Sequence, residues 1–221
     1  MARLRSSAMR RAHILFLLLC LSARPSAGAP LFDMGDKALP GKVRLSDAVV
    51  SPVAAGGETV LRIAFGLKSQ YPSIRFEPGR LGYSPDWSGA GALAITVSNA
   101  GPGSVTLGLR IDSAAATDRG RQASAEISPG KEARLLMPLG SGGAIVGMIG
   151  QPPLANARPW DAHLAPSTAP FDPARIKSFQ LFIGQPKEKH AIALRRAELV
   201  EASSEERRVG KECRSRWSSD H

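Results

Sequence analysis

The sequence predicts an all-β fold, a two-sheet sandwich of the jelly-roll type. Three observations predict it: short runs in which apolar and polar residues alternate, turn-forming residues between those runs, and almost no helical periodicity. The clearest alternation covers Ala92 to Ser98 and Ser104 to Asp112. Because successive side chains of a strand point to opposite faces, this pattern gives each strand one apolar face. Such a face is buried against a second sheet.

The segment between these two runs has the composition of a tight turn. It reads Asn99-Ala100-Gly101-Pro102-Gly103, and residues of these types dominate short loops. The two runs and this connector together predict a β-hairpin. The polar face of the second run carries Arg110 and Asp112.

The same reasoning predicts the remaining strands. They cover residues 43–50, 60–67, 71–76, 122–127, 133–139, 178–183 and 190–200. Asp172 followed by Pro173 predicts a single helical turn over 171–176. Residues 140–170 are rich in Gly, Pro and Ala, and a loop of this length is typically functional or disordered. Eight or nine short strands with almost no helix favour a sandwich or jelly roll.

Residues 1–29 have the pattern of a secretory signal peptide. Four arginines precede the apolar run Ile14 to Leu21, and small residues follow it, ending at Ala29. The run is shorter than the roughly 20 apolar residues that a membrane span needs. We therefore expect a secreted or periplasmic protein with no membrane association after cleavage. We expect residues 30–41 to form an N-terminal arm and residues 42–202 to form the β-sandwich domain.

The final stretch, residues 203–221, resembles the translation of a synthetic sequencing adapter. The likeness covers fifteen consecutive residues from Ser204 to Ser218, and charged residues crowd this stretch. We expect a non-native disordered tail; the alternative is a basic nucleic-acid-binding tail. Of the 29 basic and 19 acidic residues, the leader holds five basic ones, and the tail holds five basic and four acidic. Residues 30–202 therefore contain 19 basic and 15 acidic residues. With so small an excess of basic residues, the high overall charge does not indicate nucleic acid binding.

The central residues offer no motif for catalysis or metal binding. Both cysteines, Cys20 and Cys213, lie in the two end segments. Neither His163 nor His190 has a nucleophile motif or a second ligand at metal-binding spacing. No pair of carboxylates stands out as a glycosidase pair, and no Gly-rich loop opens a helix. We expect no catalytic residue and no cofactor in this chain, and nothing in it supports a structural calcium ion.

Carbohydrate binding is the function that the residues favour. Sugars stack on flat aromatic rings while planar polar groups hydrogen-bond their hydroxyls. The aromatic residues in or beside loops are Trp87, Tyr83, Tyr71 and Trp160, and the polar strand faces add Arg62, Arg75, Arg110, Asp112 and Gln180. From these the expected sugar-binding residues are Trp87, Tyr83, Trp160, Arg75, Arg110 and Asp112. The alternative is that Trp87 plugs the edge of the sandwich and that the arginines are solvated.

Three short segments resemble the N-terminal jelly-roll module of β-agarases and related β-galactosidase-like hydrolases. They are Tyr71-Pro72-Ser73-Ile74-Arg75-Phe76, Asp86-Trp87-Ser88-Gly89-Ala90-Gly91-Ala92-Leu93 and Leu109-Arg110-Ile111-Asp112. Residues 172–176 and 179–182 are similar to the closing strands of that module. Two positions depart from its pattern. Ala90 stands where an aromatic residue is often found, and Arg195-Arg196 replaces an Asp-Asn pair.

The resemblance implies a galactose-binding-like domain that precedes a catalytic barrel which this chain lacks. Its expected role is to bind or position a galactan or agar polysaccharide for that catalytic domain. The alternative is a purely structural domain that packs against the barrel and binds no ligand of its own.

Overall fold

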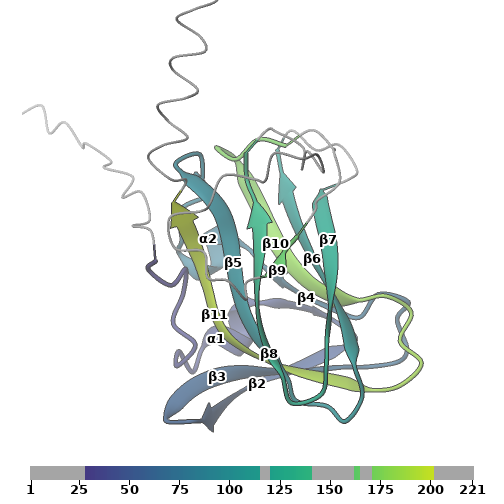
Figure 1. The fold of residues 1–221 in the computed structure, drawn as a ribbon. Helices are drawn as coiled ribbons and strands as arrows, with labels where there is room; N and C mark the ends of the chain where they lie inside the picture. The colour runs from purple at the N-terminus through teal and green to yellow at the C-terminus, as the bar shows by residue number, and fades with distance from the viewer. Residues whose placement is uncertain (1–27, 115–119, 141–161, 165–170, 202–221) are drawn as a thin grey trace, which may run out of the picture.

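The computed structural model describes residues 28–114, 120–140, 162–164 and 171–201 (Figure 1). Most of the expected signal peptide and all of the expected tail therefore lie outside the described residues. Within the described ranges the chain forms eleven strands in two sheets and two single-turn helices, α1 (Leu39–Lys42) and α2 (Pro78–Leu81). None of the described helices is long and apolar enough to cross a membrane. The predicted all-β jelly roll is confirmed.

Each sheet combines strands that lie far apart in the sequence (Figure 1). The five-stranded sheet contains, in spatial order, β1 (Arg44–Ser46), β4 (Ser73–Phe76), β10 (Ile176–Ile183), β6 (Val105–Ser113) and β7 (Arg121–Ile127). The six-stranded sheet contains β2 (Ala48–Ala55), β3 (Glu58–Phe65), β11 (His190–Glu201), β5 (Ala90–Asn99), β8 (Glu132–Pro138) and β9 (Ala162–His163). Neighbouring strands are antiparallel, except β8 and β9, which are parallel.

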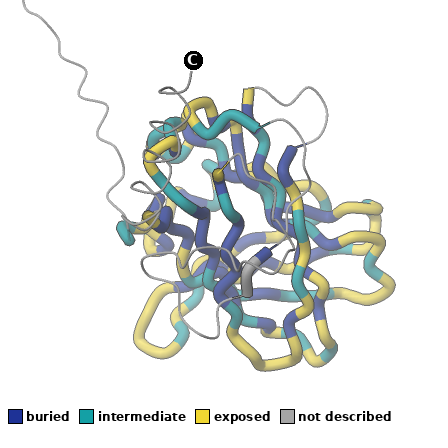
Figure 2. Tube along the Cα trace, turned by 45° about the horizontal axis from the view of Figure 1, so that its top comes forward, coloured by how far each residue is buried: buried dark blue, intermediate teal, exposed yellow. Residues whose placement is uncertain are grey.

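The core lies between the two sheets and is built by the alternation that the sequence shows. On β3, Leu61, Ile63 and Phe65 are buried while Arg62 and Ala64 are exposed. Buried and exposed residues therefore alternate along β3, whereas β5 and β8 contain unbroken buried runs. Figure 2 shows buried stretches in the strands and exposed ones mainly at the loops. Each sheet consequently has an inner apolar face and an outer face.

The predicted hairpin of β5 and β6 is wrong. β5 pairs with β11 and β8, whereas β6 pairs with β10 and β7, so the two strands belong to different sheets. The connector crosses from one sheet to the other. Asn99 stabilises it by donating its side-chain amide to the carbonyls of Gly103 and Ile127, both at 2.8 Å. Turn residues specify that the chain reverses, but not which strand becomes the hydrogen-bonded neighbour.

The single strand expected over residues 43–50 is instead two strands in different sheets. Asp47 separates β1 from β2 with a φ of 47°, in the left-handed region. Its carboxylate accepts the backbone N–H groups of Lys68 at 2.6 Å and Ser69 at 2.9 Å. Gly66 packs so closely against it that a Cβ there would lie 2.1 Å from an Asp47 carboxylate oxygen. This local contact, and not the apolar pattern, moves the chain between sheets.

The N-terminal arm is part of the folded domain. Leu31, Phe32, Met34 and Leu39 are buried in the core. The backbone N–H of Leu31 donates to the carbonyl of Ala197 at 2.7 Å, and Pro30 forms a bridge with Glu198 on β11. The helical turn expected over residues 171–176 is a hydrogen-bonded turn, in which Asp172 Oδ1 accepts the N–H of Ala174.

Candidate functional site

Two of the sequence-predicted sugar-stacking residues lie inside the core. The Trp87 side chain is 1% exposed and that of Tyr83 is 8% exposed. The Trp87 indole Nε1 donates to the carbonyl of Ser84 at 2.9 Å, and the ring packs near Tyr83 and Phe179. A sugar needs an accessible ring face, so the stacking role expected for Trp87 and Tyr83 is wrong. The alternative, that Trp87 seals the sandwich, is the one that the structure supports.

The burial of Tyr83 makes the folded protein less stable at alkaline pH. Its hydroxyl donates to the carbonyl of Phe76 at 3.0 Å, and burial, with a smaller effect from Glu77, raises its pKa well above the ordinary range. The folded state keeps this proton as pH rises through about 10, where an unfolded tyrosine loses it. We expect the free energy of unfolding to fall above that pH, by about 1.4 kcal/mol per pH unit from this group.

Denaturant unfolding between pH 9 and 11.5 measures this effect, and Tyr83→Phe is its control. The phenylalanine variant has no proton to lose, so its free energy of unfolding must fall less steeply with pH than that of the parent. Equal slopes for the two proteins would show that Tyr83 does not hold its proton in the folded state.

The charged candidates are brought together on the outer face of the five-stranded sheet. Gln180 on β10 lies directly between Arg75 on β4 and Arg110 on β6 in the strand register. The row continues to Arg44 on β1, opposite Arg75, and to Gln122 on β7, opposite Arg110. Adjacent strands lie about 4.8 Å apart, so these five planar side chains form one line across the sheet.

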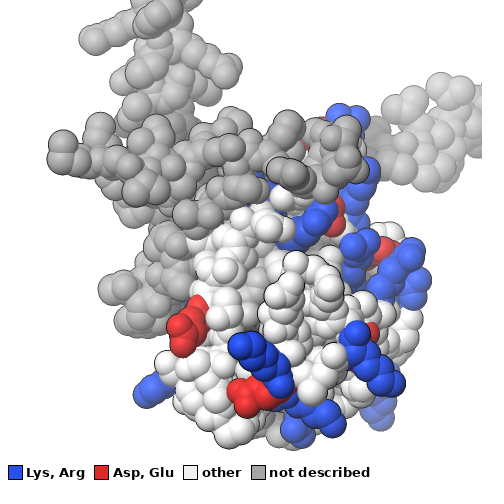
Figure 3. Space-filling view, turned by 90° about the vertical axis from the view of Figure 1, so that its right-hand side faces the viewer, with Lys and Arg blue, Asp and Glu red and all other residues white. Residues whose placement is uncertain are grey.

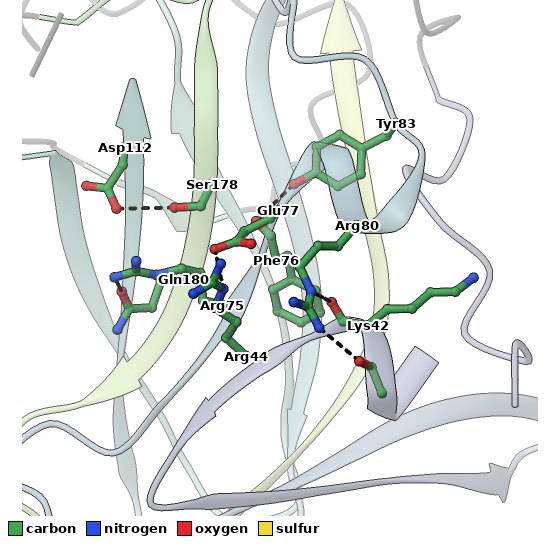
Figure 4. Close-up of polar contacts among 11 residues, drawn as sticks. Lys42, Arg44, Arg75, Phe76, Glu77, Arg80, Tyr83, Asp112, Ser178 and Gln180 are labelled. Carbon is green, nitrogen blue, oxygen red and sulfur yellow. Dashed lines mark hydrogen bonds and ion pairs between the residues drawn. The ribbon is translucent and has the colours of Figure 1, made fainter. Parts of the chain in front are cut away.

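Hydrogen bonds connect neighbours within this polar row. Arg75 donates to the Gln180 amide oxygen at 3.2 Å. Arg110 Nε donates to Asp112 Oδ1 at 2.7 Å, and Ser178 donates to the other oxygen of that carboxylate at 3.3 Å. Figure 4 shows the Arg75–Gln180 and Asp112–Ser178 contacts beside the group around Glu77. The clustering of Arg75, Arg110 and Asp112 on one face follows from their register.

An aromatic pair lies next to this row, and of its two members the sequence analysis named Tyr71 but missed Phe182. Phe182 on β10 is half-buried, and its ring lies over Gly108 of β6, where a Cβ would come within 2.4 Å of a ring carbon. Tyr71 is 53% exposed, and its ring meets that of Phe182 edge-on at 6.3 Å between centroids. Phe182 follows Ser178 and Gln180 at every second position of β10, so all three point to the outer face of the sheet. An aromatic residue at such an outward position is the feature of the sequence by which Phe182 could have been found.

We call the surface formed by Tyr71, Phe182 and the polar row the sheet-face site. Phe182 and Gln180 are two positions apart on one strand, a separation of about 6.7 Å. This spacing matches the size of one sugar ring, so a ring stacked on Phe182 brings its hydroxyls to Gln180 and Arg75. Trp160, the remaining sequence-predicted candidate, lies outside the described residues.

A groove between the N-terminal arm and strands β3, β5, β8 and β11 is an alternative site. It has a volume of about 630 Å³ and is lined in part by Phe32, Thr59, Thr96 and Arg195. The Arg195 guanidinium lies 2.7 Å from Glu132 and 3.6 Å from Glu58. These ion pairs balance the charges within the protein and favour a structural role, although the buried Arg195 Nε makes no hydrogen bond of suitable geometry within the described residues.

No group of three or more metal-ligating side chains occurs within the described ranges. The departure noted at Arg195-Arg196 places two guanidinium groups there. Arg196 contacts the Glu198 carboxylate at 2.6 Å and donates to the carbonyl of Gly28. The Arg196–Glu198 contact lies within β11, and the bond from Arg196 to Gly28 holds the segment just before the N-terminal arm against that strand.

No protein-family model matches the chain, and no curated protein matches it in sequence. Solved structures do resemble it. An exo-β-agarase matches 79% of this chain with a TM-score of 0.64 and 16% identity, and a second agarase matches 79% with a TM-score of 0.57 and 20% identity. A family 11 carbohydrate-binding module from Clostridium thermocellum, solved with a β-1,3-1,4-mixed-linked tetrasaccharide, matches 78% with a TM-score of 0.50 and 14% identity.

The extent of these matches differs between the two kinds of protein. The chain spans about a quarter of each agarase, 25% and 24%, but 95% of the carbohydrate-binding module. At these identities the likeness establishes the fold and not the ligand. The chain thus has the jelly-roll fold that is shared by a carbohydrate-binding module and by a part of these agarases.

Proposed function

We propose that this chain is a non-catalytic carbohydrate-binding module of an exported glycoside hydrolase, and that the sheet-face site binds a galactan-type polysaccharide. The observation that carries the proposal is the position of the exposed Tyr71 and the half-buried Phe182 beside a row of planar hydrogen-bonding side chains. This is the division of labour that sugar recognition requires, with a ring for stacking and flat polar groups for the hydroxyls.

The structural neighbours support the proposal through their stated ligands and activities. The matched module from Clostridium thermocellum was solved with a bound tetrasaccharide, and two of the other matched proteins are agarases. An agar-type galactan is therefore the first ligand to test. Because the chain spans about a quarter of the agarases, the parent protein of this module is proposed to continue into a separate catalytic domain.

The test is binding of agar oligosaccharides to the full 221-residue chain, measured by calorimetry. We expect Phe182→Ala to weaken binding about tenfold or more, because it removes the stacking surface at the centre of the site. Gly108→Ala is a second variant of the same surface. Its new methyl group occupies the position of the Phe182 ring and pushes the ring away while keeping it in the protein.

Val49→Ala is the matched control. Val49 is an exposed apolar residue on β2 in the other sheet, so its truncation must leave binding unchanged. Thermal melting of all three variants separates a binding defect from unfolding. If the chain retains no oligosaccharide, or if Phe182→Ala binds as well as the parent, the sheet-face site is not a sugar site. The purely structural role on a catalytic barrel then remains.

A further inference from the structure

The sheet-face site contains one arginine that has no carboxylate partner among the described residues. The only hydrogen bond of Arg75 within that part of the chain is to the uncharged amide oxygen of Gln180. The arginines on either side differ. Arg44 contacts the Glu77 carboxylate at 2.8 Å, and Arg110 contacts the Asp112 carboxylate at 2.7 Å. The three guanidinium groups of the row thus have two carboxylate partners among the described residues.

The positive charge of Arg75, unpaired among the described residues, lies where it destabilises the folded state. Arg44 and Arg75 stand directly opposite each other on adjacent antiparallel strands, and like charges in this position repel. A fourth guanidinium, that of Arg80 on α2, donates to the backbone carbonyls of Lys42 and Gly41 at 2.8 and 3.0 Å (Figure 4). The basic side chains therefore extend along the edge of the sheet from the polar row to the two short helices.

Basic side chains are also spread across the side of the molecule that Figure 3 shows, with acidic ones among them. A guanidinium group with open donors binds the oxygens of a sulfate ester or a carboxylate in a bidentate manner, and these contacts are stronger than those to neutral hydroxyls. An anionic group beside Arg75 would also remove the repulsion between Arg75 and Arg44.

From this arrangement we propose that the sheet-face site prefers an anionic polysaccharide, with Arg75 binding a sulfate ester or uronate carboxylate of the chain. This inference rests on the proposed function, because it assigns a ligand class to the same site. Phe182 and Tyr71 supply the contact with the sugar ring, and Arg75 supplies the selection for charge. Arg44 and Gln180 flank the anion on the neighbouring strands.

The experiment compares three oligosaccharides of equal length on the full chain: a neutral agar type, a sulfated galactan and a galacturonate. We expect at least one anionic ligand to bind about tenfold tighter than the neutral one at low salt. This advantage must shrink at high salt, because salt screens exposed charge pairs. Binding of the sulfated ligand alone assigns the anion as sulfate, and binding of the galacturonate alone assigns it as carboxylate.

Two arginine variants test which residue causes the preference for an anionic ligand. Arg75→Gln keeps a planar hydrogen-bonding side chain without the charge, so it is expected to remove the anionic advantage while weakening neutral binding by a clearly smaller factor. Arg62→Gln, on the outer face of the other sheet, removes one exposed strand arginine elsewhere and must leave the advantage intact.

Each other outcome contradicts a specific statement. Equal affinity for the neutral and anionic ligands, still dependent on Phe182, overturns the charge preference and leaves the carbohydrate-binding function standing. Equal effects of Arg75→Gln and Arg62→Gln show general electrostatic attraction and overturn the assignment to Arg75. Failure of all three ligands to bind overturns the proposed function itself.

Discussion

Trp87→Ala is expected to lower the free energy of unfolding by about 3–5 kcal/mol, the range for removing a large aromatic side chain from a core. The indole is 1% exposed, its Nε1 donates to Ser84, and its ring lies 6.4 Å from that of Phe179 between centroids. The backbone N–H of Trp87 also donates to the carbonyl of Pro173 at 2.7 Å, so the ring sits where two loops meet. Urea unfolding followed by circular dichroism measures the loss.

Trp87→Phe is the matched control for this prediction. It keeps an aromatic ring but loses the hydrogen bond to Ser84, so we expect a smaller loss, of about 1–2 kcal/mol. Oligosaccharide binding by Trp87→Ala, measured well below its melting temperature, is expected to equal that of the parent. A stable Trp87→Ala protein that no longer binds sugar would restore the stacking role that the sequence suggested for this residue.

Phe32→Ala is expected to lower the free energy of unfolding by a similar amount, about 3–5 kcal/mol. Phe32 lies in the N-terminal arm, yet its ring stacks on Phe76 at 5.1 Å and on Phe179 at 6.3 Å between centroids. Its loss leaves a cavity under the start of the domain and loosens the pairing of Leu31 with Ala197. Urea unfolding and limited proteolysis near residue 32 report the two effects.

Tyr71→Ala is the control for the Phe32→Ala variant in the N-terminal arm. Tyr71 is an exposed aromatic residue of similar size, so its truncation should change the free energy of unfolding by no more than about 0.5 kcal/mol. If Phe32→Ala were no more destabilising than Tyr71→Ala, the arm would not be packed into the core in solution. A truncation at residue 42 would then be expected to fold as well as the longer chain.

The local alternation of residue types was sufficient to predict the all-β class and most of the strands. β3, β5, β6, β7, β8, β10 and β11 coincide with predicted segments to within a few residues. The period of two is a local property of each strand, since it depends only on which face of that strand is buried. For the same reason the polar outward positions of Arg75, Arg110 and Asp112 could be predicted.

Strand pairing and the burial of loop aromatics depended on contacts between distant segments. The turn after Asn99 is compatible with a hairpin or with a crossover, and the choice is made by β11, which pairs with β5 almost a hundred residues later in the chain. Trp87 and Tyr83 look accessible in sequence because they lie in a loop, but Phe32, Phe76 and Phe179 surround them in the core. Phe182 belongs to the site because Gly108, on another strand, leaves room for its ring. A sequence shows which residues each strand presents, whereas packing across sheets decides which of them meet and which remain open to a ligand.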